Sequence, residues 1–292
     1  MKPNTFIIGA PKCGTTALSA YLSDHPNVFL SNPKEPNYFA SDLPERQLIT
    51  SLEDYEALFY SVDAEHSVIL EASTWHLVSR DAVHNILEYQ PDARIIVMLR
   101  NPVDLIHSLH WQQVYSLEEP VESFERAWRL QDERAFESVQ FQYGRLGRLG
   151  EQLARVLEQC SQDRLHVVFF DDLSSDPGNV YRQILDFLDL PTDHRREFPV
   201  VNAAKHWRNL FLANLVQNPP FGLNRALRAA KKVLGIEELG WSGRLQQANT
   251  RTARRKPLTL ELRSELASYF AEDMRLISRL TGRDVAGWLP SD

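Results

Sequence analysis

Short apolar runs alternate with helical patterns along the first two thirds of the chain. The apolar, β-prone runs lie at 5–9, 28–30, 67–71, 94–99 and 165–173. The run RIIVML at 94–99 is nearly continuous, which is typical of a strand buried on both faces. Between the runs, apolar residues recur at helical spacing at 15–26, 81–90, 103–115 and 149–160. This alternation predicts an α/β fold, a three-layer sandwich with a central parallel sheet flanked by helices and ligand sites at the carboxyl ends of the strands.

The pattern changes in the last third. The segment at about 203–247 is amphipathic and basic, and Pro219-Pro220 interrupts it. We interpret it as a helical excursion packed on the main domain, with an acceptor lid or a membrane-surface helix as the alternative. A basic loop at 250–257 precedes a long final helix at 258–280. There is no internal repeat, so we predict one domain over 1–292.

Composition narrows the class of protein. The 292 residues are 43% hydrophobic and 24% charged, which is ordinary for a globular protein with a sizeable core. A formal net charge of −7 argues against nucleic acid as a partner, because binding phosphates requires a basic face. The two cysteines, Cys13 and Cys160, cannot make a disulfide framework and indicate a reducing compartment. No signal peptide or integral membrane segment is evident, so we expect a cytoplasmic protein.

The first strand leads into GAPKCGTT, which has the glycine spacing of a phosphate-binding loop at Gly9 and Gly14. A strand, a glycine loop and a helix start present several backbone N–H groups to one anion, and the helix dipole adds to the attraction. In nucleoside triphosphatases the lysine follows the second glycine, whereas here Lys12 precedes it. We expect Lys12 to stabilise charge on a leaving-group oxygen. The alternative is a tight turn with a solvated lysine.

A second candidate anion site follows the strand at 94–99. Arg100 leaves the end of this strand, and Ser108 lies eight residues later on the next predicted helix. An arginine in this position is commonly just solvated. Beside the glycine loop, however, a second anion site suits a nucleotide that is phosphorylated at both ends.

Three stretches, GAPKCGTT, NPKEPNYF and LRNPVDLIHS, resemble the signatures of the PAPS-dependent sulfotransferases, a P-loop-type family, and in particular its bacterial and heparan sulfate members. PAPS is 3′-phosphoadenosine 5′-phosphosulfate. The resemblance implies in-line transfer of a sulfuryl group from PAPS to a hydroxyl or amine, without a metal, releasing adenosine 3′,5′-bisphosphate. It implies that the 5′-phosphosulfate is held by Pro11, Lys12, Cys13, Gly14, Thr15 and Thr16. It assigns the 3′-phosphate to Arg100 and Ser108, with Arg251 and Arg254 of the basic loop as a cover.

The stretch KEPNYF resembles a loop of the heparan sulfate members whose glutamate is the catalytic base, which implies that role for Glu35. Chemically, an acceptor hydroxyl must lose its proton as it attacks sulfur, and a fixed carboxylate can take that proton. The alternative is that Glu35 only pairs with Lys34 on an exposed loop. The phenol-type members use a histidine, so His107 and His110 are the second candidates.

The acceptor is not specified by these motifs, because acceptor loops vary on a shared scaffold. A carbohydrate, a lipid-linked glycan and a small alcohol all remain candidates. Trp75, His76 and Trp111 are candidates for lining the acceptor cleft, although such side chains commonly belong to the core. The oligomeric state is equally open.

Two other function classes compete with a sulfotransferase. In a P-loop kinase or NTPase, Asp171 and Asp172 at the end of VVFFDDL would hold magnesium. Against this class stand the missing lysine after Gly14 and the second anion site at Arg100. The third class is a nucleotide-binding interaction protein without catalysis.

Overall fold

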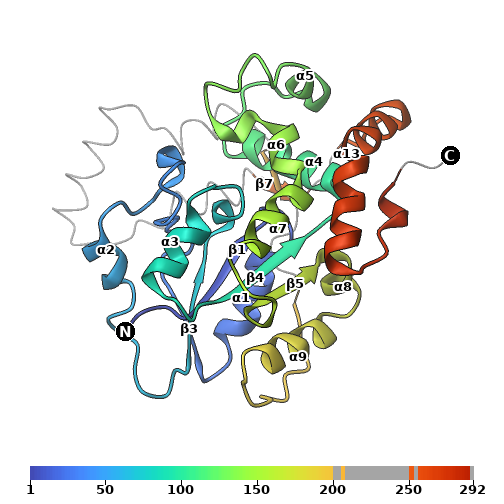
Figure 1. Cartoon of the computed structure of the whole chain (residues 1–292). Helices are drawn as coiled ribbons and strands as arrows, with labels where there is room; N and C mark the ends of the chain where they lie inside the picture. Colours follow the sequence, from blue (N-terminus) through green and yellow to red (C-terminus); the bar gives the residue numbers. More distant parts are fainter. Residues whose placement is uncertain (200–204, 208–249, 253–255, 290–292) are drawn as a thin grey trace. The chain divides into compact units, whose positions relative to one another are not determined.

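The computed structural model describes residues 1–199, 205–207, 250–252 and 256–289. The chain divides into two compact units. The first consists of Met1–Leu109, Ser123–Val201 and Leu258–Asp292, and the second of His110–Glu122 and Asn202–Pro257. The first unit contains the large sheet and nearly all of the described helices (Figure 1).

A five-stranded parallel sheet forms the centre of the first unit. Its strand order is β2-β3-β1-β4-β5. The strands are β1 (Thr5–Gly9), β2 (Val28–Leu30), β3 (Val68–Ala72), β4 (Arg94–Leu99) and β5 (Leu165–Phe169). In the register of the three central strands, Thr5 lies opposite Leu70 on one side and Arg94 on the other. Every residue of β1 and β3 is buried, as expected for parallel strands covered on both faces.

Helices cover both faces of this sheet, which confirms the predicted three-layer α/β sandwich. The chain moves from β1 to β2 in one direction through α1 (Thr15–Ser23), and from β3 to β4 and on to β5 in the opposite direction. Because such crossovers are right-handed, the helices on the return path lie on the opposite face from α1. These are α3 (Ala82–Tyr89) and α7 (Leu149–Leu157), which lie in front of the sheet in Figure 1.

Shorter elements connect and extend these layers. The other α-helices are α2 (Leu52–Ala57), α4 (Pro102–Tyr115), α5 (Phe124–Arg129), α6 (Tyr143–Gly147), α8 (Phe170–Ser175), α9 (Pro177–Phe187) and α13 (Leu260–Thr281). Single 3₁₀ turns occur at η1 (Pro44–Arg46), η2 (Thr74–His76), η3 (Val139–Phe141), η4 (Gln162–Arg164) and η5 (Ala286–Trp288). Among the helices of the described ranges, none is both long and apolar enough to cross a membrane.

The last strand is shorter than the apolar pattern predicts. The sequence predicts a strand over 165–173, but β5 ends at Phe169 and α8 begins at the next residue. The neighbouring strand explains the difference, because β4 ends at Leu99, the residue opposite Phe169. Beyond this point the backbone of residues 170–173 has no strand to pair with, and it forms a helical turn instead.

The long C-terminal helix α13 supports α7. The carboxylate of Asp273 on α13 accepts hydrogen bonds from the backbone N–H groups of Gly150 (2.8 Å) and Glu151 (2.9 Å), in the first turn of α7. This carboxylate satisfies N–H groups that have no partner within α7. The two helices approach closely here, since a Cβ on Gly150 would lie 2.6 Å from the carbonyl oxygen of Asp273. Glycine is therefore required at position 150.

The second unit contains a short antiparallel pair, β6 (Lys205–Trp207) and β7 (Thr250–Thr252). Apart from 205–207, the helical excursion that we predict at 203–247 lies outside the described residues. Its role, and the prediction of a single domain over 1–292, stay predictions.

Candidate active site

The glycine loop lies at the carboxyl end of β1, where the strand order of the sheet reverses. In open α/β sheets this switch point is where ligands bind. Three residues here have positive φ: Gly9 (144°), Lys12 (65°) and Gly14 (88°). A side chain at Gly14 would be strained, and its Cβ would also lie 2.8 Å from Leu173. The backbone thus curls tightly into the N-terminus of α1, as the sequence predicts.

The side chains of this loop differ in what they offer to a ligand. Cys13 is fully buried, its Sγ lies 3.6 Å from the carbonyl oxygen of Pro11, and burial raises the pKa of the thiol to about 12. It is therefore a core residue, and only its backbone is available to the loop. Thr15 is also buried, whereas Lys12 and Thr16 are partly exposed.

Arg100 reaches the glycine loop directly. Its Nη1 donates to the carbonyl oxygen of Lys12 at 3.0 Å, and its guanidinium lies 4.3 Å from the centre of the Phe170 ring. Ser108 is buried on α4, and its hydroxyl has no hydrogen-bond partner in the described part of the chain. Buried hydroxyl groups almost always have a partner, so this orphan hydroxyl is a candidate ligand contact.

The Glu35 carboxylate is held in place from both sides. Its Oε1 accepts from the Lys34 ammonium at 2.7 Å, and its Oε2 accepts from the backbone N–H (2.7 Å) and the hydroxyl (3.0 Å) of Thr74. The backbone of Glu35 is fixed too, since its N–H donates to the carbonyl oxygen of Ala72 at 3.0 Å. The side chain is about one third exposed. The pair with Lys34 therefore exists, but it is part of a rigid arrangement at the end of β3.

Thr74 connects this carboxylate to the glycine loop. A Cβ on Gly9 would lie 2.7 Å from the carbonyl oxygen of Thr74, so the two backbones are in contact. The neighbouring Ser73 donates its N–H to Ile7 and accepts from the N–H of Asn37. The sequence motifs do not single out Ser73 or Thr74. Their position directly after a buried parallel strand was the only available signal.

A buried acid and a buried imidazole lie beneath this segment. Glu71 and His76 are both 0% exposed, and their Oε2 and Nδ1 are 3.9 Å apart. Burial raises the pKa of Glu71 to about 8 and lowers the pKa of His76 to about 3. Both groups are thus neutral near pH 6, and their proximity is a contact between uncharged groups rather than an ion pair. His76 belongs to the core and does not line a cleft.

The two alternative bases lie on α4. His107 is partly exposed and meets the edge of Phe124, with ring centres 5.3 Å apart. His110 is 0% exposed, and its Nε2 lies 3.0 Å from the carbonyl oxygen of Glu122. Burial and this contact make His110 poorly available to an acceptor.

The two tryptophans considered for the acceptor cleft have different surroundings. Trp75 is partly exposed, and the guanidinium of Arg46 lies 4.4 Å from its ring centre. Trp111 is buried, with its ring 5.5 Å from that of His110 in the second unit. Of the two, only Trp75 is partly exposed.

The basic loop is only partly described. Arg251 lies in β7 opposite His206, and Arg254 lies outside the described residues. Their assignment to the 3′-phosphate stays a prediction.

The acidic pair of the kinase alternative has other partners. Asp171 accepts from the indole N–H of Trp288 at 3.0 Å, and Asp172 pairs with Arg283 at 2.6 Å. Both lie in the first turn of α8 rather than at the end of a strand. Within the described ranges, no cluster of three or more histidine, cysteine or acidic side chains could hold a metal ion.

Comparison with known proteins identifies the family of this chain. Residues 2–226 match the sulfotransferase domain family. A crystal structure of a sulfotransferase from Alicyclobacillus acidocaldarius superposes with a TM-score of 0.75, at 25% identity, over 99% of both chains.

Curated relatives from animals match a smaller part of the chain. A bifunctional heparan sulfate N-deacetylase/N-sulfotransferase 1 from Caenorhabditis briggsae is 27% identical over 68% of this chain, and a heparan sulfate glucosamine 3-O-sulfotransferase 3A1 from Mus musculus is 27% identical over 64%. The chain spans only 23% and 46% of the length of these two relatives. The family match covers most of the chain and includes the glycine loop, Glu35, Arg100 and Ser108, so this protein belongs to the sulfotransferase domain family and is a transferase.

Proposed function

We propose that this protein transfers a sulfuryl group from PAPS to a hydroxyl or amine of a carbohydrate or other small-molecule acceptor. The observation that carries this proposal is the position of the Glu35 carboxylate. Thr74 fixes it through two hydrogen bonds, and the backbone of Thr74 contacts Gly9 at the start of the glycine loop. A proton acceptor and an anion-binding loop thus share one edge of the sheet.

The residues around the loop fit a donor with phosphate groups at two positions. The N-terminus of α1 and the curled backbone before it suit the 5′-phosphosulfate. Arg100 and the orphan hydroxyl of Ser108 suit the 3′-phosphate, because a phosphate oxygen accepts hydrogen bonds from both kinds of group. Arg100 also donates to the backbone of Lys12, which ties the two halves of this candidate site together.

The proposed transfer forms one bond to sulfur and breaks another. The acceptor oxygen forms a bond to sulfur while the bond from sulfur to the bridging phosphate oxygen breaks. The acceptor proton passes to Glu35, whose Oε1 accepts one hydrogen bond, from Lys34, and retains a second lone pair. Lys12 stabilises the negative charge that develops on the departing phosphate. No step requires a metal.

The acceptor class rests on the relatives. Two of them are named for heparan sulfate, which favours a carbohydrate over a lipid-linked or other small-molecule acceptor.

Replacing Glu35 with glutamine tests this proposal. Glutamine keeps the shape but accepts no proton, so transfer from PAPS should fall by about 10²–10⁴-fold while the affinity for adenosine 3′,5′-bisphosphate is unchanged. Glu56→Gln is the matched control, because this partly exposed glutamate of α2 also accepts a hydrogen bond, from Tyr89 at 3.0 Å. Near-full activity of the Glu35 variant would remove it as the base. Magnesium-dependent phosphoryl transfer would support the kinase alternative instead.

A further inference from the structure

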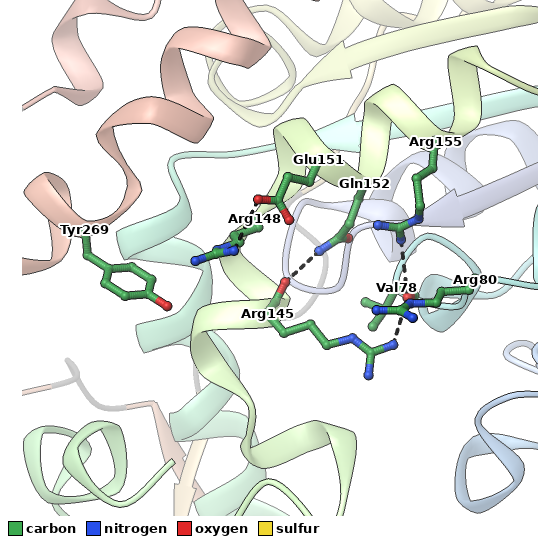
Figure 2. Close-up of a pocket in the computed structure, with 8 residues that line it drawn as sticks. All are labelled: Val78, Arg80, Arg145, Arg148, Glu151, Gln152, Arg155 and Tyr269. Carbon is green, nitrogen blue, oxygen red and sulfur yellow. Dashed lines mark hydrogen bonds and ion pairs between the residues drawn. The ribbon is translucent and has the colours of Figure 1, made fainter. Parts of the chain in front are cut away.

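An arginine-lined cavity includes none of the residues assigned to PAPS. It has a volume of about 330 Å³, and its lining residues are Val78, Arg80, Arg145, Arg148, Glu151, Gln152, Arg155 and Tyr269. Four arginines and one glutamate give this lining a formal charge of +3, in a chain whose formal net charge is −7. Figure 2 shows Arg80, Arg145 and Arg155 gathered around Val78, with Arg148 and Tyr269 on the other side.

The four arginines differ in their ion pairing. Arg148 pairs with Glu151 at 3.2 Å. Arg80, Arg145 and Arg155 form no ion pair with a carboxylate in the described part of the chain. Burial and the neighbouring arginines lower the pKa values of Arg145 and Arg155. The structure therefore holds three like charges together, and an anion would relieve their repulsion.

Two acidic groups outside the lining, Asp42 and Glu45, attract these arginines electrostatically but have other hydrogen-bond partners. Asp42 accepts from the hydroxyl of Ser79 and from the backbone N–H of Arg80. Glu45 lies within 3.4 Å of the Ser138 hydroxyl and of the N–H of Val139. Neither carboxylate forms an ion pair with the arginines of the cavity.

One of the lining residues, Gln152, carries an orphan hydrogen-bond acceptor. Gln152 is almost completely buried, since only 3% of its surface is exposed. Its Nε2 donates to the carbonyl oxygens of Arg145 (2.9 Å) and Leu146 (3.3 Å), which fixes the orientation of the amide. Its Oε1 has no partner among the described residues. A fully ionised anion such as sulfate supplies no donor for this oxygen, whereas a hydroxylated ligand does.

This cavity is connected to the candidate active site by a short stretch of backbone. Arg155 donates to the carbonyl oxygens of Leu77 (3.2 Å) and Val78 (3.4 Å), and Arg145 donates to that of Val78 (3.4 Å). Leu77 in turn donates its N–H to Ile8 of β1 at 2.7 Å. Val78 is four residues from Thr74, whose N–H and hydroxyl bind the Glu35 carboxylate.

We propose that this cavity binds the phosphate ester of a hydroxylated ligand, in particular a phosphorylated sugar. Arginine guanidinium groups match the oxygens of a tetrahedral phosphate, and the +3 lining favours a dianion over a singly charged carboxylate or sulfate ester. The sugar hydroxyls supply the donor that the Oε1 of Gln152 lacks. The inference rests on the proposed function in one respect: it makes a phosphorylated saccharide the acceptor that is presented to Glu35.

Direct binding to the full chain tests the site without requiring transfer. The probes are glucose 6-phosphate, glucose 6-sulfate, glucuronate, glucose and inorganic phosphate, measured by calorimetry at low ionic strength. Glucose 6-phosphate should bind most tightly, about 100-fold more tightly than glucose, and added salt should weaken it. Equal affinity for glucuronate or for glucose 6-sulfate would overturn the assignment to a phosphate dianion. Equal affinity for inorganic phosphate would overturn the role of the sugar, and no binding at about 10 mM would overturn the site itself.

Arginine variants test whether glucose 6-phosphate binds in this cavity. Arg145→Gln combined with Arg155→Gln should weaken glucose 6-phosphate binding by about 10–100-fold. Arg275→Gln, which changes an exposed arginine paired with Glu272, is the matched control and should have no effect. If the double variant does not fold, Arg80→Gln, at an exposed position, is the test, and it should weaken glucose 6-phosphate binding by about fivefold. Unchanged affinity in the folded variants would overturn the proposal.

Donor binding separates this inference from the proposed function. The double variant should bind adenosine 3′,5′-bisphosphate as tightly as the native chain does, and Arg100→Ala should leave glucose 6-phosphate binding unchanged. A parallel loss of both ligands in the double variant would show that the cavity belongs to the donor site. If the bisphosphate does not bind the native chain but the sugar phosphate does, the proposed function fails and the cavity assignment stands.

Discussion

The buried pair of Glu71 and His76 makes a prediction about stability that can be worked out from its pKa values. Burial raises the pKa of Glu71 from 4.5 to about 8, so between these pH values the native state holds a proton that the unfolded state has lost. The free energy of unfolding therefore falls as pH rises through this window. From pH 4.5 to pH 7 this single group lowers it by about 3 kcal/mol.

His76 acts in the opposite direction. Burial lowers its pKa from 6.5 to about 3, so between these values the unfolded state binds a proton that the native state does not. The free energy of unfolding rises with pH in this window, by about 2.5 kcal/mol from pH 4.5 to pH 7. The two contributions nearly cancel in the native protein. Glu71→Gln removes the contribution that falls with pH. Between pH 4.5 and pH 7, the free energy of unfolding of the variant should therefore rise by about 3 kcal/mol more than that of the native chain.

Urea unfolding at pH values between 4.5 and 7.5 measures this effect as the difference between variant and native chain. His76→Asn should show the opposite slope, and the double variant should run parallel to the native chain. The control is His84 and Glu88 on α3, which lie at the same 3.9 Å separation but are 74% and 77% exposed. Glu88→Gln should leave the profile unchanged. A Glu71→Gln profile parallel to the native one would refute the reasoning.

Three further predictions concern the donor site and the fold. Arg100→Ala should weaken binding of adenosine 3′,5′-bisphosphate by about 10–100-fold and hardly change binding of a nucleotide without the 3′-phosphate; equal losses would contradict its role. Lys12→Ala should lower turnover by about 10²–10³-fold with a smaller loss of PAPS binding, and a defect confined to binding would make it a positioning residue. Asp273→Ala should lower the free energy of unfolding by about 1–2 kcal/mol in urea, whereas Glu272→Gln should not.

Local chemistry explains which parts of the site could be predicted. The glycine loop was predictable because its strand, its glycines and the following helix are contiguous in sequence. Glu35 could be proposed as the base from the resemblance and from its place after the second predicted strand, but its two hydrogen bonds from Thr74, 39 residues away, could not be predicted. The buried state of His76 was not predictable, since a histidine after a strand is equally compatible with a cleft.

The arginine cavity could not be predicted either, because its residues come from segments that are far apart in the sequence. Arg145 and Arg155 lie on helices α6 and α7, but the partner segment at Val78 is 67 and 77 residues away. The overlong prediction for β5 has a related cause. The apolar pattern does not record where the neighbouring strand ends.

The hydrogen bonds between α13 and α7 have a consequence for the order in which parts of this protein fold during synthesis. Gly150 and its acceptor Asp273 are separated by 123 residues. At ribosomal rates of about 5–20 residues per second, the first turn of α7 waits about 6–25 s for its cap after it has been translated. The strands of the large sheet are all translated before that time. The glycine loop can therefore form early in synthesis, whereas the arginine cavity is completed only when α13 caps α7. A chaperone that shields α7 during this interval would act on the cavity rather than on the glycine loop.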